Sequence, residues 1–460
     1  MYNKNAWSKY KDEKDLAKLM EFNEGYKKFI SYGKTERLCV KQAIEIAEKY
    51  GFKDIKSFNK LNPGDKVYVT NRGKNICTFV IGDEPMEKGI NILGAHIDSP
   101  RLDLKQNPLY ESCDFSLLDT HYYGGIVKYQ WVARPLALHG VVYKKDGKEI
   151  LVNIGENEND PVFVISDLLP HLAAEKNSKP GNKVIEGEGL DITFSSIPLN
   201  DDDKKAVKAN VLEILKKQYN IEEEDFVSAE IEVAPAGPAR DLGLDKSMIL
   251  GYGHDDRVCA YTSLMAVLDA GKAKYTTCAF LVDKEEIGSV GATGAQSAWF
   301  ENILAELMNL CGDYSELKLR RCLSKSRMLS SDVSAGYDPL YKSVFEEKNA
   351  AYCSKGIVFN KYTGARGKSG CNDADPKFIA QIRNIMDKNN IYYQTAELGK
   401  VDVGGGGTIA YILGNKDMYV IDAGVSILSM HAPCEIVSKV DVYEAYLAYI
   451  AFVKEAKEVE

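Results

Sequence analysis

The sequence lacks an excess of positive charge, and it also lacks long apolar runs. Its 67 acidic residues outnumber its 58 basic residues, and the formal net charge is −9. No polybasic tract interrupts this balance, so a nucleic-acid partner held through its phosphates is not expected. No apolar stretch reaches the roughly 18 residues that a membrane-spanning helix needs. The amino-terminal residues alternate charged with apolar side chains, which is not the pattern of a signal peptide.

Closely spaced cysteines are missing as well. Ten cysteines are scattered along 460 residues, without a C-x-x-C pair or a dense framework. In a chain of this size, such cysteines are typical of reduced and partly buried thiols rather than disulfides. We therefore expect a cytoplasmic protein.

The length and the hydrophobic pattern predict two structural units. A chain of 460 residues exceeds the size at which a single core usually stops growing. Near residues 1–101 and 240–460, apolar strands alternate with helices, a rhythm typical of an α/β domain with a mostly parallel central sheet flanked by helices. Residues 102–239 differ, because they contain a hairpin pattern and then a long polar stretch. We predict that this β-rich domain interrupts the α/β domain, and that it closes with a helix over 201–219 and a strand over 225–235.

Two of the six histidines stand near predicted strand ends. In NILGAHIDSPRLD, the H-x-D spacing points His96 and Asp98 to one side of a strand. Asp98 can then hold the ring nitrogen that His96 does not use on a metal. His431 lies in VSILSMHAPCEIVSKVD, between an apolar strand and the last predicted helix. Neither histidine decides the function alone, since an isolated H-x-D is more often structural.

Acidic residues occupy similar places. Asp255 and Asp256, in GYGHDDRVCAY, fit a metal site, but they also fit the cap and first turn of a helix. Glu285 and Glu286 follow a buried strand in FLVDKEEIGSVG, where they would repel each other and lose hydration. One of them can coordinate a metal while the other reaches the adjacent water, although an exposed acidic turn is the alternative. Asp332 follows the strand in MLSSDV.

These segments together resemble one known family. GAHIDSPRLD, DKEEIGS, SSD and SMHAP are similar, in this order, to motifs of the aminopeptidase I and aspartyl aminopeptidase family of zinc exopeptidases. The resemblance runs along almost the whole chain, and HDDRV is also similar to the related glutamyl-type aminopeptidases. It implies that His96 and Asp332 bind one metal ion and that Glu286 and His431 bind the other. Asp255 would bridge the two ions.

The same resemblance implies that Glu285 is the general base and that Asp98 orients His96. Asp256 remains an alternative bridge, because it is adjacent to Asp255 and equivalent in chemistry. Two divalent ions would activate a shared water and polarise the scissile carbonyl. Two imidazoles among the ligands favour zinc, with cobalt or manganese also possible. Glu285 could then take the proton of the water and pass it to the leaving amine.

The substrate pocket is less well defined. The family has a histidine in the inserted domain that contributes to this pocket, and His171 is the candidate here. Lys361 is a second candidate, which could meet a substrate carboxylate. Animal aspartyl aminopeptidases have a histidine three residues after the ligand that matches Asp332, and Ala335 occupies that place here. The preference for acidic or neutral amino-terminal residues therefore stays open.

We predict a metallo-aminopeptidase that removes single amino-terminal residues from peptides. In the resembling family the inserted domain builds dimers that assemble into a tetrahedral dodecamer, so self-association is also expected. One rival is a glycosidase with Glu285 and Glu286 as its carboxylate pair, but adjacent residues rarely reach opposite sides of a bond. A second rival is a non-catalytic assembly or cargo protein with a relic metal site.

Overall fold

The computed structural model describes residues 4–200, 204–364 and 367–459. The chain forms two compact units. The first contains the residues up to Asp98, Ala239–Met430 and the residues from Cys434 onward, and the second contains Ser99–Pro238 and His431–Pro433. No described helix is both long and apolar enough to cross a membrane.

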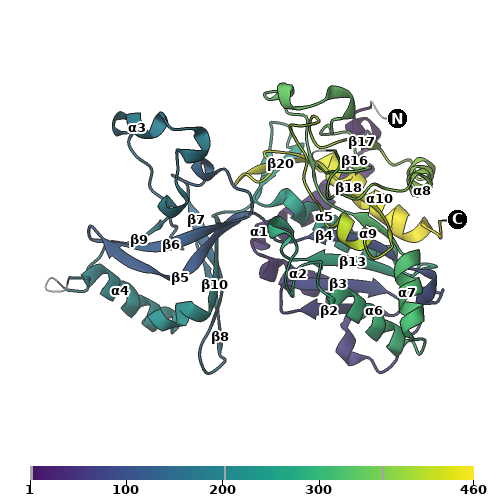
Figure 1. Ribbon diagram of the computed structural model, residues 1–460, viewed down its shortest axis with the longest axis horizontal. Coiled ribbons are helices and arrows are strands. Elements are labelled where there is room, and N and C mark those ends of the chain that lie inside the picture. Colours follow the sequence, from purple (N-terminus) through teal and green to yellow (C-terminus); the bar gives the residue numbers. More distant parts are fainter. Residues whose placement is uncertain (1–3, 201–203, 365–366, 460) are drawn as a thin grey trace. The chain divides into compact units, whose positions relative to one another are not determined.

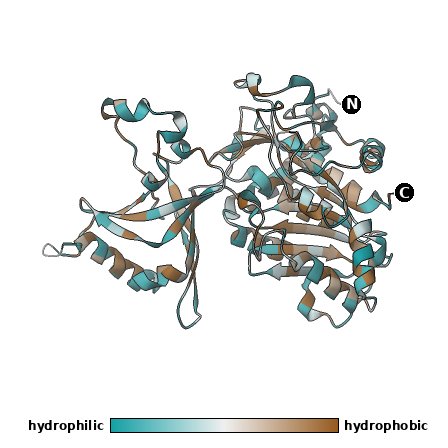
Figure 2. Ribbon diagram, in the orientation of Figure 1, coloured by the Kyte–Doolittle hydropathy of each residue, from teal (hydrophilic) through white to brown (hydrophobic). Residues whose placement is uncertain are grey.

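A mixed sheet of nine strands forms the centre of the first unit (Figure 1). Its strands, in spatial order, are β1 (Lys53–Asp54), β2 (Lys66–Asn71), β3 (Asn75–Val80), β13 (Thr277–Val282), β4 (Asn91–His96), β14 (Arg327–Ser330), β18 (Tyr419–Gly424), β16 (Ile357–Asn360) and β17 (Tyr393–Thr395). The four central strands, from β13 to β18, are all parallel. These strands consist mainly of apolar residues (Figure 2), as expected when both faces of a parallel sheet are covered.

Helices cover both faces of this sheet. One core contains apolar side chains of α1 (Glu13–Tyr32), α2 (Glu36–Lys49), α5 (His254–Ala270), α8 (Pro376–Lys388) and α10 (Lys439–Glu455). The other contains those of α6 (Trp299–Leu310), α7 (Glu316–Lys325) and α9 (Ala410–Gly414). Several of these helices begin at a residue whose side chain caps the first turn, such as Asp12 before α1 and Asp375 before α8. The predicted α/β fold is confirmed.

A second sheet in the same unit has five short strands. They are β11 (Arg240–Leu242), β12 (Met248–Gly251), β20 (Glu435–Ser438), β19 (Ser426–Leu428) and β15 (Ser334–Ala335), in spatial order. Four neighbouring pairs join them, and three of these pairs are antiparallel. Strands of two to four residues leave no periodic pattern, and the sequence did not predict this sheet.

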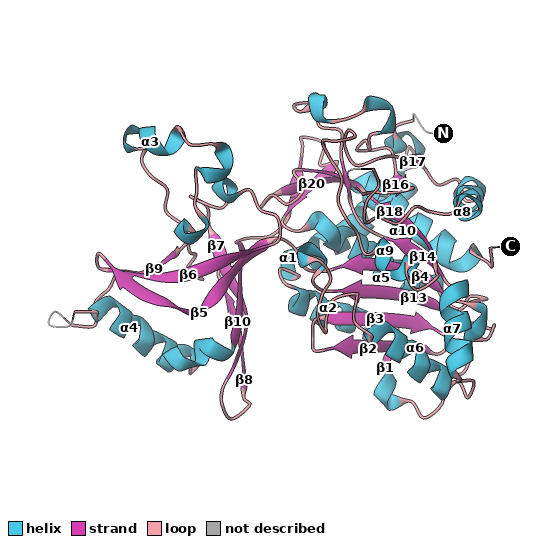
Figure 3. Ribbon diagram, in the orientation of Figure 1, coloured by secondary structure: helices cyan, strands magenta, loops and turns pink. Residues whose placement is uncertain are grey.

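The second unit contains an antiparallel sheet of six strands (Figure 3). They are β8 (Glu149–Ile154), β7 (Leu136–Tyr143), β10 (Ala229–Pro235), β5 (Arg101–Ser112), β6 (Phe115–Tyr123) and β9 (Ile192–Ser195), in spatial order. β7 and β8 form the predicted hairpin, and Asp146 and Gly147 lie in the turn between them. The unit also contains the short helices α3 (Ala174–Asn177) and α4 (Ala206–Ile214).

Two element bounds in this unit differ from the prediction. The helix expected over 201–219 is α-helical only over Ala206–Ile214, continues as a π-helical turn over Leu215–Tyr219, and has its first three predicted residues outside the described part of the chain. The strand expected over 225–235 begins at Ala229. Glu223–Ser228 forms a 3-10 helix instead, because the side chains of Glu222 and Asp225 form a capping box there.

Candidate metal centre

The parallel strands β13, β4 and β14 end side by side, so the residues that follow them meet at one edge of the sheet. His96 is the last residue of β4 and pairs with Val282, the last residue of β13. Glu285 and Glu286 follow β13 in a 3-10 turn, and Asp332 follows β14. The carboxyl end of a parallel sheet is the usual place for a binding site.

Three carboxylates surround one ring nitrogen of His96. Its Nε2 lies 3.1 Å from Oδ1 of Asp255, 3.9 Å from Oδ1 of Asp332 and 3.9 Å from Oε2 of Glu285. The side chains of His96, Asp255 and Asp332 are 2 %, 5 % and 11 % exposed, whereas that of Glu285 is 17 % exposed. The site therefore gathers buried acidic groups around an imidazole, and Glu285 has the most contact with solvent.

Asp98 faces the other side of the imidazole. Nδ1 of His96 lies 3.3 Å from Oδ1 of Asp98 and 3.0 Å from its backbone carbonyl oxygen. The Asp98 carboxylate also accepts hydrogen bonds from the backbone N–H groups of Glu285 and Glu286, each at 3.2 Å. One buried carboxylate thus fixes both the ring and the acidic turn. This second contact has no sequence signal, because it depends on the turn that follows β13.

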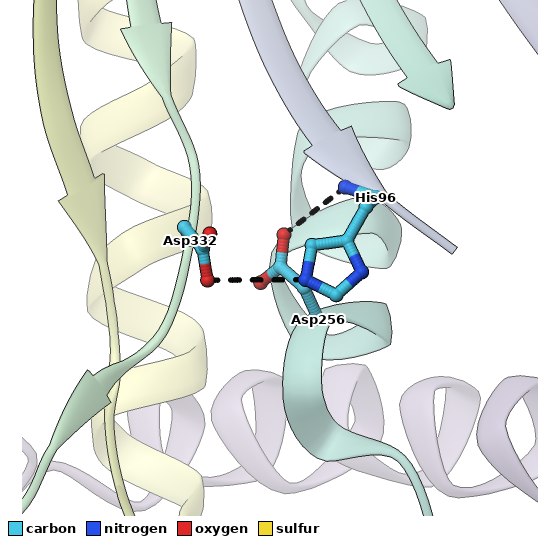
Figure 4. A group of neighbouring side chains, drawn as sticks. All are labelled: His96, Asp256 and Asp332. Carbon is cyan, nitrogen blue, oxygen red and sulfur yellow. Dashed lines mark hydrogen bonds and ion pairs between the residues drawn. The ribbon is translucent and has the colours of Figure 1, made fainter. Parts of the chain in front are cut away.

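Asp255 and Asp256 lie in the first turn of α5, where both have non-helical backbone angles. The peptide bond between them is cis. The N–H of Asp255 donates to Oε2 of Glu435, at 3.0 Å. Oδ2 of Asp256 accepts the backbone N–H of His96, at 3.3 Å (Figure 4). Both aspartates therefore contact the His96 region, Asp255 at the ring and Asp256 at the backbone.

Close backbone packing holds Asp332 at the site. A Cβ atom added to Gly424, at the end of β18, would lie only 1.9 Å from the carbonyl oxygen of Asp332. Any larger residue at position 424 would push this loop away. Figure 4 shows the carboxylate of Asp332 directed toward Asp256 and the ring of His96.

Two groups of side chains in the described part of the chain fit a metal ion at this edge. They are His96, Asp256 and Asp332, and His96, Asp255 and Glu286. Within each group, the possible ligand atoms all lie within 4.8 Å of one another. Imidazole and carboxylate ligands suit zinc and similar divalent ions. So many buried carboxylates also need a cation to offset their charge.

The pKa values of these groups reflect the crowding. Burial raises the pKa of Asp256 well above 3.8, and the nearby Asp332 carboxylate raises it further. Burial also raises the pKa of Asp332, and the carboxylates of Glu285 and Asp255 add to this effect. Burial alone would lower the pKa of His96, but hydrogen bonds to Asp255 and Asp98 outweigh it, so this pKa is well above 6.5. Asp256, Asp332 and His96 therefore hold their protons to a higher pH than the same side chains do in water.

The other predicted site residues are His431, His171 and Lys361. His431 belongs to the second unit, where its Nδ1 lies 3.0 Å from the carbonyl oxygen of Gly125. His171 lies in an exposed 3-10 turn of the same unit, Pro170–Leu172. Lys361 follows β16, is half-exposed, and has its Nζ 3.6 Å from Oδ1 of Asp373.

Comparison with known proteins identifies the family. The family model described as aminopeptidase I zinc metalloprotease (M18) matches residues 29–453. A probable M18 family aminopeptidase 1 from Clostridium acetobutylicum is 60 % identical over 446 residues, which cover 96 % of each chain. The chain belongs to the M18 aminopeptidase family. It is therefore a metallo-aminopeptidase, a hydrolase of a zinc metalloprotease family.

Solved structures agree with the fold of this M18 aminopeptidase. The crystal structure of an M18 family aminopeptidase from Thermotoga maritima matches with a TM-score of 0.95 and 43 % identity, over 99 % of this chain and 100 % of that one. The structure of the S. cerevisiae mApe1 dodecamer matches with a TM-score of 0.74 and 21 % identity, over 93 % of this chain and 95 % of that one. This second likeness extends to the fold alone.

The raised pKa values predict how metal binding to the M18 aminopeptidase depends on pH. A group whose pKa is raised in the folded state stabilises the fold at pH values below its ordinary pKa, which is about 3.9 for Asp and about 6.5 for His. This stabilisation is lost as the pH rises through the pKa of the group in the folded state. A zinc ion bound by His96 and Asp332 would replace the protons of these two side chains. We expect the difference in melting temperature between zinc-loaded and chelated protein to widen from about pH 5 to about pH 8. Thermal scans across this range, at fixed free zinc, would contradict the prediction if the difference narrowed.

Proposed function

We propose that this aminopeptidase binds two divalent ions, zinc in the first instance, at the carboxyl end of its central sheet. His96 and Asp332 would hold one ion, Glu286 and His431 the other, and Asp255 would bridge them. The observation that supports this best is the group of carboxylate oxygens, 3.1 to 3.9 Å away, around Nε2 of His96. When bound, the ions would activate a water molecule and polarise the carbonyl group of the first peptide bond.

Glu285 is the proposed general base. Its carboxylate reaches to 3.9 Å from Nε2 of His96 and is the most exposed of the three that surround this nitrogen. Glu285 can therefore accept a proton from water in the site and transfer it to the leaving amine. Asp98 would orient the neighbouring site residues, because its carboxylate contacts the ring of His96 and accepts the N–H groups of Glu285 and Glu286.

The substrate is a peptide with a free amino terminus, and its preferred first residue is the least defined part of the proposal. Lys361 is a candidate for a substrate carboxylate, but Asp373 lies 3.6 Å from its Nζ and competes for its charge. Ala335, in β15, offers no charged group to an acidic side chain. These two features favour neutral over acidic first residues.

We propose that the chain also self-associates through its second unit, as dimers that assemble into a dodecamer. Leu168, Leu169 and Leu172 beside His171 are 48 %, 52 % and 69 % exposed. Adjacent exposed leucines are typical of a surface that another chain covers. His171 would then contribute to the substrate pocket from this surface. The S. cerevisiae structure of the same fold is described as a dodecamer.

A cytoplasmic location is part of the same proposal. None of the ten cysteines forms a disulfide in the described part of the chain, and several are buried as thiols in the core. Reduced cysteines are typical of cytoplasmic proteins.

The test is hydrolysis of acidic, aliphatic and basic aminoacyl chromogenic substrates before chelation, after it, and after zinc, cobalt or manganese is added back. We expect chelation to remove at least about 99 % of the activity, since metal-activated water is the nucleophile. Zinc or cobalt should restore it at two ions per chain, measured by elemental analysis. Activity indifferent to chelation would reopen the glycosidase rival, and a protein inactive and metal-poor under all conditions would favour the non-catalytic one.

A further inference from the structure

A buried ionic cluster directly precedes the acidic turn. It consists of Glu36, Lys74, Asp283 and Thr293, all in the first unit, and we call it the Asp283 cluster. Nζ of Lys74 lies 2.9 Å from Oε1 of Glu36 and 3.9 Å from Oδ2 of Asp283. The hydroxyl of Thr293 donates to the same Oδ2, at 2.6 Å. Glu36 and Asp283 are 0 % and 1 % exposed, so both carboxylates are buried, whereas the side chain of Lys74 is 12 % exposed.

The cluster closes the base of the loop that contains Glu285. Asp283 follows β13 directly, and its backbone pairs with Gly294 in a parallel bridge. Thr293 binds the Asp283 side chain from the far end of the same loop. Between them, Lys284 adopts a left-handed conformation with φ of 70°, which turns the chain into the 3-10 turn Glu285–Ile287.

The turn is thus fixed at two points by two different carboxylates. Asp98 accepts the N–H groups of Glu285 and Glu286, at 3.2 Å each. Asp283, the residue before Lys284, is held by a hydrogen bond from Thr293 and by the nearby ammonium group of Lys74. A general base must be held in reach of its proton, and misplacement by about 1 Å lowers a rate by roughly a hundredfold. Two anchors on a three-residue turn supply this restraint.

Stability alone does not favour a carboxylate at position 283. Burial and the carboxylates of Glu36 and Asp98 raise the pKa of Asp283 to about 7. This pKa exceeds the ordinary value of about 3.9, so the stabilisation present at low pH is lost as the pH rises through about 7. At pH 8 the ionised side chain therefore costs stability. An asparagine would keep the shape and the bond from Thr293 without the charge.

We propose that Asp283, held by Lys74 and Thr293, is a positioning residue that sets the carboxylate of Glu285 for proton transfer. The proposal rests on the role of Glu285 as the general base. It explains why two buried carboxylates share the partly exposed Lys74 beside the acidic turn, at a place where a neutral side chain would be more stable.

Asp283→Asn should lower kcat by about tenfold, while KM changes less than about twofold and both metal ions stay bound. Its melting temperature at pH 8 should equal or exceed that of the parent. Thr293→Val, which removes the donor to Asp283, should lower kcat about threefold. The measurements are kcat and KM on one chromogenic substrate, metal content per chain, and thermal melting of the zinc-loaded protein.

The matched control is Glu444→Gln, in α10. Glu444 is also fully buried: it forms an ion pair with Lys9 at 2.8 Å and accepts a hydrogen bond from the backbone N–H of Tyr392 at 2.7 Å. It lies in α10 rather than next to the acidic turn. We expect this variant to lower the melting temperature and to leave kcat unchanged. A merely structural role of Asp283 would give the same pattern as the control.

An unchanged kcat in Asp283→Asn would overturn the proposal, whatever the melting temperature. So would a loss of kcat that follows a loss of bound metal. If Asp283→Asn does not fold, an unchanged kcat in folded Thr293→Val overturns it equally. Glu285→Gln distinguishes a failure of this proposal from a failure of the proposed function. Full activity of Glu285→Gln would show that Glu285 is not the general base, whereas low activity of Glu285→Gln with an unchanged kcat in Asp283→Asn would show only that Asp283 does not position it.

Discussion

Glu285→Gln should reduce kcat by about a thousandfold and leave two metal ions bound to each chain. A positioned general base contributes about 10² to 10⁴ to a rate, and glutamine cannot accept the proton. The substitution keeps the shape of the side chain. The backbone N–H at position 285 can still donate its hydrogen bond to Asp98, because this bond does not involve the side chain of Glu285. KM should therefore change little. The measurement is kcat and KM on the best substrate of the aminoacyl panel, with metal content determined on the same sample.

Glu286→Gln is the matched comparison, since the two residues share one turn and one anchor, Asp98. We expect it to lose activity through loss of one metal ion, with partial recovery at high zinc, whereas Glu285→Gln should not recover. If Glu285→Gln loses metal and Glu286→Gln does not, the two roles are exchanged. Full activity of Glu285→Gln would show that another group takes the proton.

The position of the site could be predicted from the sequence because it depends on strand ends. His96, Glu285 and Asp332 each follow an apolar run that reads clearly as a strand, and parallel neighbours end at the same edge. This rule alone brings the three residues to one edge of the sheet. The resemblance to a family then supplied roles that the pattern alone left open.

The contacts that fix these residues could not be predicted in the same way. Glu435 accepts the N–H of Asp255 from a strand of four residues in the five-stranded sheet. Tyr26, in α1, donates to or accepts from Nδ1 of His254 at 2.5 Å and so fixes the residue before Asp255. Both partners are far from position 255 in sequence, and neither belongs to a periodic pattern. Only the folded chain brings them together.

The second large effect concerns the two adjacent aspartates. We expect Asp255→Asn to lose both metal ions and to reduce kcat by at least about a thousandfold, because a bridging carboxylate holds both ions at once. Oδ1 of Asp255 lies 3.1 Å from the ring nitrogen of His96 that a metal would occupy. Its N–H is fixed by Glu435, which leaves the carboxylate directed into the site.

Asp256→Asn should retain its metal and lose much less activity, because Oδ2 of Asp256 is already used by the backbone N–H of His96 at 3.3 Å. The measurement is metal content by elemental analysis after desalting, with kcat on the same two samples. The opposite ranking would move the bridge to Asp256, in line with its place beside His96 and Asp332 in one of the two possible ligand groups. Equal loss of metal in both variants would mean that each aspartate holds an ion, since neither could then replace the other.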